Sequence, residues 1–291
     1  MDKLAKLDKL QNQMYDLADD KKIFDLTEKN HVFFEEIADS IIQACQDKNF
    51  YIVYQSHIST KTNNIRGAEA LCRLSAKIDG ESVEIKPYAL FLIANYFGFD
   101  KHLSLALFDQ VVKDTHAFKK QIDNEFITSF NINPSLFDED MCTKILEIID
   151  QHNLPRKNIA IELVEHSGLE NITEQMMKHY KTHGLRLYLD DFGTGYSNQS
   201  KLDLPFDVVK FGGQLIDGIA HKPQNQQIVK NTTDICRQKE IITIAEHVEN
   251  QEDLETIKKC KIDYVQGYIF NQPLTFEEFI GAYSKQNQSG K

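Results

Sequence analysis

The sequence predicts an α/β fold of the TIM-type (β/α) barrel class, and two observations lead to that prediction. Short apolar, β-like runs recur along the chain and are separated by segments of helix length, which is typical of βα repeats. The length of 291 residues is ordinary for such a barrel, which takes about 250 residues. No stretch approaches the ~18 consecutive apolar residues of a membrane span.

Charge and cysteine content exclude several classes of ligand and site. A net charge of −11 argues against binding a polymeric nucleic acid, which needs a basic surface, but it allows a small phosphate ligand held with metal ions. The five cysteines form no CxxC pair, so neither a zinc site nor a disulfide framework is indicated. The N-terminus lacks the apolar core of a signal peptide. We therefore expect a cytoplasmic protein with reduced thiols.

The N-terminal 28 residues are highly charged and carry apolar residues in a 3-4-3 spacing. Leu7, Leu10, Met14 and Leu17 would lie on one face of a single amphipathic helix. The segment is too short for a coiled coil of three or four heptads. Two interpretations stay open: a helix packed on the barrel, or a dimer contact. We treat residues 1–29 as an N-terminal helical extension.

The next elements predict a hairpin. Residues 31–47 form an apolar-faced helix, and residues 51–58 alternate like a strand. A polar turn at 61–64 leads back into a second strand over 65–74. So short a connection joins only antiparallel strands, which is unusual inside a parallel barrel.

After two further helices, over 88–98 and 101–119, strand–helix alternation continues to the end of the chain. Helices are expected near 137–151, 172–183, 224–238, 251–260 and 275–284. No low-complexity linker interrupts the series. We expect one domain over residues 30–285 and a frayed tail at 286–291.

The apolar runs share one feature, which is that each ends in a polar residue. In a (β/α) barrel the C-terminal ends of the strands converge on one site, so these residues should meet. They are Glu69, Asn131, Glu162, Asp190 with Asp191, Lys210, Glu246 and Gln266.

The chemistry of this set points to two divalent cations. Five carboxylates in one pocket would repel one another without bound cations. Oxygen ligands without histidine or cysteine suit Mg²⁺ or Mn²⁺. The adjacent Asp190 and Asp191 suit two metals about 4 Å apart, an arrangement that cleaves phosphodiesters. Any single acid could instead be a surface strand end or a helix cap, but seven such endings in series exceed what capping explains.

The segment Asp190 to Ser197, DDFGTGYS, is the most specific of these strand ends. Gly193 and Gly195 permit tight turns and close approach of a ligand. In isolation the segment could equally be an ordinary βα turn.

Taken together, these motifs resemble those of the EAL-domain phosphodiesterases, which hydrolyse cyclic di-GMP to linear pGpG. The signature Glu69-Ala70-Leu71 is followed by Arg73 at the family's arginine. The other matching segments follow in order over residues 32–284: Tyr54-Gln55, Asn131 in FNINPSLF, Glu162 to Glu165, DDFGTGYS, Pro205 with Asp207 and Lys210, Glu246 to Glu249, and Gln266-Gly267-Tyr268. The resemblance implies a modified (β/α)8 barrel with one antiparallel strand, in agreement with the hairpin.

The resemblance also implies a role for each residue. Glu69, Asn131, Glu162 and Asp190 would hold one metal, and Asp190 and Asp191 the second. Glu246 would be the general base, Lys210 would orient the attacking water, and Gln266 and Glu249 would complete the site. Gln55, Leu71 and Arg73 would contact the dinucleotide. Glu165 would support the loop that in the family couples metal binding to the dimer interface, so a homodimer is expected.

Four positions depart from the family pattern. Ser56 replaces a proline, and Val164 replaces a threonine. His247 replaces a glycine; it is strained if the position requires a positive φ, and otherwise it is a solvent-facing ring without a role. Gly212 replaces an acid that follows the catalytic lysine, which predicts weakened metal binding or turnover rather than their loss.

Three functions remain open at this stage. The first is a metal-dependent cyclic di-GMP phosphodiesterase. The second is a degenerate EAL domain that senses cyclic di-GMP or binds a protein, which His247 and Gly212 favour. The third, an unrelated metal-dependent barrel enzyme, would not explain the ordered motifs.

Overall fold

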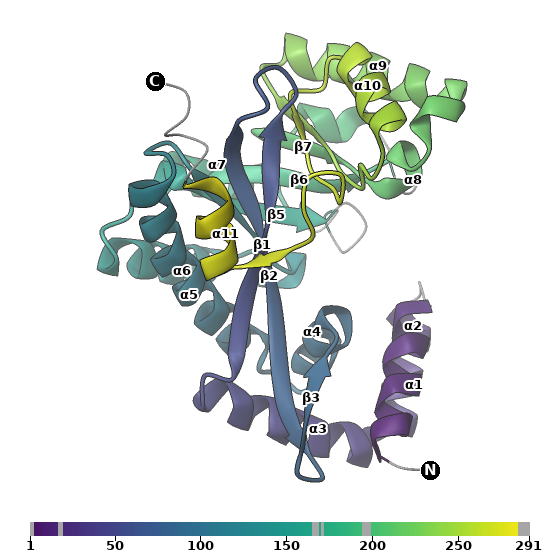
Figure 1. Ribbon diagram of the computed structural model, residues 1–291. Coiled ribbons are helices and arrows are strands. Elements are labelled where there is room, and N and C mark those ends of the chain that lie inside the picture. Colours follow the sequence, from purple (N-terminus) through teal and green to yellow (C-terminus); the bar gives the residue numbers. More distant parts are fainter. Residues whose placement is uncertain (1–2, 17–19, 165–168, 170–171, 194–198, 285–291) are drawn as a thin grey trace. The chain divides into compact units, whose positions relative to one another are not determined.

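The computed structural model describes residues 3–16, 20–164, 169, 172–193 and 199–284 (Figure 1). They form two compact units. The N-terminal unit comprises Met1–Ile52 and Cys72–Phe108, and the barrel unit comprises Val53–Leu71 and Asp109–Lys291. Among the described residues, no helix is both long and apolar enough to cross a membrane.

In the described part of the barrel unit, eight strands close into a barrel. In spatial order they are β1 (Phe50–Ser59), β9 (Tyr264–Val265), β8 (Ile242–Ala245), β7 (Val208–Phe211), β6 (Arg186–Phe192), β5 (Ile159–Val164), β4 (Ile127–Asn131) and β2 (Ile65–Ile78), with β1 pairing with β2 to close the ring. The neighbours from β2 to β9 pair in parallel. β1 is antiparallel to β9 and to the short β10 (Leu274–Thr275). The modified (β/α)8 barrel with one antiparallel strand is thereby confirmed.

The helices of this unit follow the strands as predicted, and side-chain caps mark several of their starts. Asp138, Thr173 and Asn250 each accept a hydrogen bond from a backbone N–H in the first turn. The helices are α5 (Asp100–Gln121, which spans both units), α6 (Glu139–Gln151), α7 (Glu174–Thr182), α8 (Gly213–Ile216), α9 (Pro223–Gln238), α10 (Gln251–Lys259) and α11 (Phe276–Tyr283). Single 3-10 turns are η1 (Pro134–Leu136), η2 (Arg156–Asn158), η4 (Gln199–Asp203) and η5 (Ile219–His221).

One layer of buried residues comes from four adjacent strands of the barrel. Ala160, Tyr188, Val208 and Ile244 come from β5 to β8 and pack as one cluster. Figure 1 shows β5, β6 and β7 side by side, as their parallel pairing requires. In these four strands, every second residue counted from this layer lies on the same face.

In the N-terminal unit, α1 (Lys3–Asp16) packs against α4 (Pro87–Tyr96). Leu7, Leu10 and Met14 are buried, as their spacing predicts. The described residues form two helices, α1 and α2 (Asp20–Lys29), where one was predicted; Leu17 lies outside the described residues. The unit also contains α3 (His31–Gln46) and β3 (Glu81–Ile85). β3 pairs antiparallel with the end of β2 and was not predicted from the sequence.

Candidate active site

Four of the predicted site residues come two positions along the chain after the residues of the core layer. Glu162, Asp190, Lys210 and Glu246 come two residues after Ala160, Tyr188, Val208 and Ile244, respectively. Because side chains on one face of a strand recur at every second residue, the four point into the barrel above that layer. All four are buried. The strand-end prediction therefore has a simple geometric basis.

Lys210 lies at the centre of this cluster, and its side chain is completely buried. Its Nζ lies 2.8 Å from Glu162 Oε2, 2.8 Å from Glu246 Oε1, 2.9 Å from Asp190 Oδ1 and 3.3 Å from Glu69 Oε2. One ammonium group is thus shared by four carboxylates that come from four strands. We call these five residues the Lys210 cluster.

One positive charge does not balance four buried acids. Burial raises the pKa of Glu162 to about 8 and also raises the pKa values of Asp190 and Glu246. Burial acts against the charge of Lys210, but the four surrounding carboxylates outweigh it and hold the lysine pKa well above its ordinary value. The cluster therefore favours the binding of either protons or further cations.

Glu69 differs from the other acids because two amides hydrogen-bond to it. Asn131 Nδ2 donates to Glu69 Oε1 over 2.7 Å, and Gln266 Nε2 donates to Glu69 Oε2 over 2.7 Å. Burial acts to raise the pKa of Glu69, but Lys210 and these two hydrogen bonds lower it below its ordinary value. Glu69 is thus the acid that this site keeps ionised most readily.

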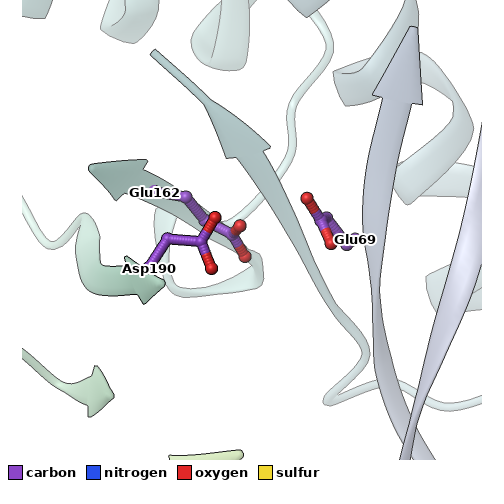
Figure 2. Close-up of side chains that lie close together, drawn as sticks. All are labelled: Glu69, Glu162 and Asp190. Atoms are coloured by element: carbon purple, nitrogen blue, oxygen red, sulfur yellow. The ribbon is translucent and has the colours of Figure 1, made fainter. Parts of the chain in front are cut away.

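The residues fit a divalent cation of the hard class. Glu69, Glu162 and Asp190 each offer one oxygen, and these oxygens lie within 4.8 Å of one another. Figure 2 shows Glu162 and Asp190 close together, with Glu69 facing them from another strand. Glu162 Oε1 is buried and has no hydrogen-bond partner among the described residues, so it is available as a ligand. Carboxylate oxygens of this kind are suited to Mg²⁺ or Mn²⁺.

A second layer of polar side chains surrounds Gln266. Its Nε2 also donates to Gln55 Oε1 over 3.1 Å, and its Oε1 lies 3.0 Å from Nε2 of His57. Burial lowers the pKa of His57 to about 3, so its imidazole is neutral. No motif in the sequence predicts a role for His57. The one indication is that His57 follows Gln55 by two residues, which places both side chains on the same face of β1.

The other predicted site residues lie outside the Lys210 cluster. Asp191 is half-buried with φ 56°, in a register irregularity of β6, and its charge contributes to raising the pKa of Asp190. Leu71 is half-buried on β2, and the exposed Glu249 lines a surface hollow with His247. Arg73 belongs to the N-terminal unit, where its Nε lies 4.0 Å from Glu84 Oε1. Glu165 and positions 194–197 lie outside the described residues.

The departures from the family pattern differ in their backbone conformation. His247 has φ 56°, so the conditional prediction of strain applies, although its side chain is also 60% exposed. Gly212 has φ −71° and ψ 165°, which any residue can adopt. Ser56 accepts hydrogen bonds from Asn271 Nδ2 over 2.7 Å and from the Tyr283 hydroxyl over 2.9 Å, and the second of these bonds links β1 to the end of α11. Val164 lies opposite Asp190 in the β5–β6 pair.

Comparison with known proteins agrees with the fold and the motifs. The family model of the EAL domain matches residues 38–273. The chain is 26% identical over 239 residues to the probable cyclic di-GMP phosphodiesterase PdeB of Escherichia coli K12, which covers 81% of this chain and 45% of PdeB. It spans less than half the length of eight curated relatives that it matches.

Two solved structures extend the comparison. An EAL domain protein from Listeria monocytogenes EGD-e has 27% identity and a TM-score of 0.71, covering 85% of this chain and 98% of that protein. The EAL enzyme Bd1971 in its cAMP- and cyclic-di-GMP-bound form shares the fold, with 22% identity, a TM-score of 0.77, and coverage of 91% of this chain and 76% of that one. The motifs, the barrel and the matched family model together show that this chain belongs to the EAL domain family.

Proposed function

We propose that this chain hydrolyses cyclic di-GMP to linear pGpG in a reaction that requires Mg²⁺ or Mn²⁺. The observation that carries the proposal is the Lys210 cluster, in which four buried carboxylates from four strand ends surround one lysine. The names of relatives support the choice of substrate, because PdeB is named as a probable cyclic di-GMP phosphodiesterase and Bd1971 binds cyclic di-GMP.

Two groups of residues would hold the cations. Glu69, Asn131, Glu162 and Asp190 would hold one ion, and Asp190 with Asp191 would hold the other. Bound metal ions of this kind lower the pKa of water and neutralise charge on a phosphodiester. The available Glu162 Oε1 and the proximity of the three carboxylates support this assignment.

The remaining residues of the cluster would carry the proton and the developing charge. Glu246 would accept the proton of the attacking water, and its Oε1, 2.8 Å from Lys210 Nζ, lies beside the group that would orient that water. Lys210 would orient that water and stabilise negative charge on the phosphate. Gln266 and Glu249 would complete the site, and Gln55, Leu71 and Arg73 would contact the dinucleotide.

The competing proposal is a degenerate EAL domain that binds cyclic di-GMP, or a protein, with little turnover. The strained His247 and the glycine at position 212 favour it. The retention of the four buried acids and of Lys210 favours the enzyme, because a pure binding domain has little need for all of them.

We further propose that the protein is cytoplasmic and homodimeric, with the N-terminal helices as a candidate dimer contact.

The deciding experiment is incubation of the purified chain with cyclic di-GMP and either Mg²⁺ or Mn²⁺, followed by chromatography of the nucleotides. We expect pGpG as the product, and no product from Glu69→Ala. A matched control is Glu125→Ala, because Glu125 is an exposed acid that pairs with Lys157. Tight binding without pGpG under both metals would support the sensor. Sedimentation of the chain with and without residues 1–28 tests the dimer.

A further inference from the structure

His57 is a buried polar residue to which the strand-end motifs assign no role. Only 4% of its surface is exposed, and it lies on β1 facing the same side as Gln55. A polar ring in such a place needs a hydrogen-bond partner, and Gln266 provides one.

The direction of the His57–Gln266 bond follows from the partners of Gln266. Its amide N–H groups both face acceptors, Glu69 Oε2 at 2.7 Å and Gln55 Oε1 at 3.1 Å. Its Oε1 is therefore the atom that faces the ring, and Nε2 of His57 must carry the hydrogen. The reverse orientation of the amide would place its oxygen against a carboxylate oxygen of Glu69, which is unfavourable.

We propose that His57 is a positioning residue: it holds the Gln266 amide so that the amide hydrogen-bonds to Glu69 and fixes that carboxylate for cation binding. Asn131 holds the other oxygen of Glu69, so both oxygens are restrained by donors. This role rests on the proposed function. It connects His57 on β1, through Gln266 directly after β9, to Glu69 on β2. Outer partners of this kind orient ligands and raise the affinity for metal.

The test is calorimetric titration of Mn²⁺ into the purified protein and its variants. We expect about tenfold weaker Mn²⁺ binding for His57→Leu, within the range for loss of an outer partner. His57→Gln keeps an N–H donor and should restore most of the affinity. His57→Ile is a second apolar variant with a preference for strands, for use if His57→Leu fails to fold. Thermal unfolding of each variant checks the fold.

A double-mutant cycle separates positioning through Gln266 from a packing role. If His57 acts through Gln266, then Gln266→Leu alone weakens Mn²⁺ binding, and adding His57→Leu weakens it no further. Additive losses, or an affinity of His57→Leu equal to that of the parent protein, would overturn the proposal.

Failure of the proposed function is distinguishable from failure of this inference. Absence of pGpG with the parent protein contradicts the phosphodiesterase, while the Mn²⁺ titration still decides the role of His57. If the parent protein does not bind Mn²⁺ either, a crystal structure of His57→Leu decides. We expect the Gln266 amide to have left Glu69, and an amide still donating to Glu69 would overturn the proposal.

Discussion

Lys210 Nζ lies 2.8 Å from Glu162 Oε2, and both side chains are completely buried. A buried pair of this kind is costly unless further partners satisfy it. Here three more carboxylates share the ammonium, while the second oxygen of Glu162 has no partner among the described residues. The arrangement leaves an excess of negative charge that bound cations would relieve, and this makes stability and metal binding interdependent.

Stability should therefore fall as pH rises in the presence of a chelator. The pKa of Glu162 is raised from 4.5 to about 8, so the folded state holds a proton that the unfolded state has released between these values. Unfolding then releases protons, and the free energy of unfolding falls as pH rises through this window. The raised pKa values of Asp190 and Glu246 act in the same direction.

Thermal unfolding in EDTA between pH 5 and pH 8 measures this effect, and a parallel series with Mn²⁺ is its control. We expect the melting temperature to fall with pH in EDTA and to fall much less with Mn²⁺, since binding to the folded state stabilises it. A melting temperature that rises over this range in EDTA would contradict the assignment of raised pKa values to these buried acids.

Glu162→Gln should separate stability from metal binding. A neutral amide resembles the protonated acid that the raised pKa favours at neutral pH, so the free energy of unfolding in EDTA should change by only about 1 kcal/mol. Mn²⁺ affinity should fall by more than the roughly 10–100-fold that loss of an outer partner costs. Calorimetry and denaturant unfolding measure the two effects. Glu125→Gln, at an exposed ion pair, should alter neither.

The barrel and its cluster could be predicted because one rule, alternation along strands, governs both. The same spacing that buries Ala160 and Tyr188 brings Glu162 and Asp190 to the strand ends on the same face. Parallel strands then bring their ends together without any knowledge of side-chain contacts. The short turn between β1 and β2 likewise predicts the antiparallel closure.

Three features of the structure follow no such rule and were not predicted: β3, the contact of His57 and the irregularity at Asp191. β3 is a short, mostly exposed edge strand with little alternation, although Asp79 and Gly80, both at positive φ, form the kind of turn that Asp-Gly predicts. His57 belongs to no motif; the sequence places it only on the same face of β1 as Gln55, and the proposed role comes from its distance of 3.0 Å to Gln266. The irregularity at Asp191 depends on how β6 pairs with β7, which sequence periodicity does not report.

Gly212→Asp should increase turnover or Mn²⁺ affinity by about tenfold, as restoration of an outer partner would. The backbone at Gly212, with φ −71° and ψ 165°, accepts any residue, so the substitution adds no backbone strain. Its carboxylate would follow Lys210 by two residues, where the family pattern has an acid. Gly212→Ala is the matched control, because it adds a side chain without charge. If Gly212→Asp and Gly212→Ala change turnover and Mn²⁺ affinity equally, the gain comes from the backbone and not from the carboxylate.

His247→Gly should stabilise the protein by about 1 kcal/mol, which is the approximate cost of a left-handed conformation for a residue with a Cβ. The gain comes from φ 56° at this position, and little is lost with the side chain, which is 60% exposed and lies 4.0 Å from Asp217 at Nδ1. Denaturant unfolding of the parent protein, His247→Gly and His247→Ala measures the effect. Alanine removes the ring but keeps the Cβ, so it should give no gain. If alanine stabilises the protein as much as glycine does, the strain lies in the ring contacts and not in the backbone.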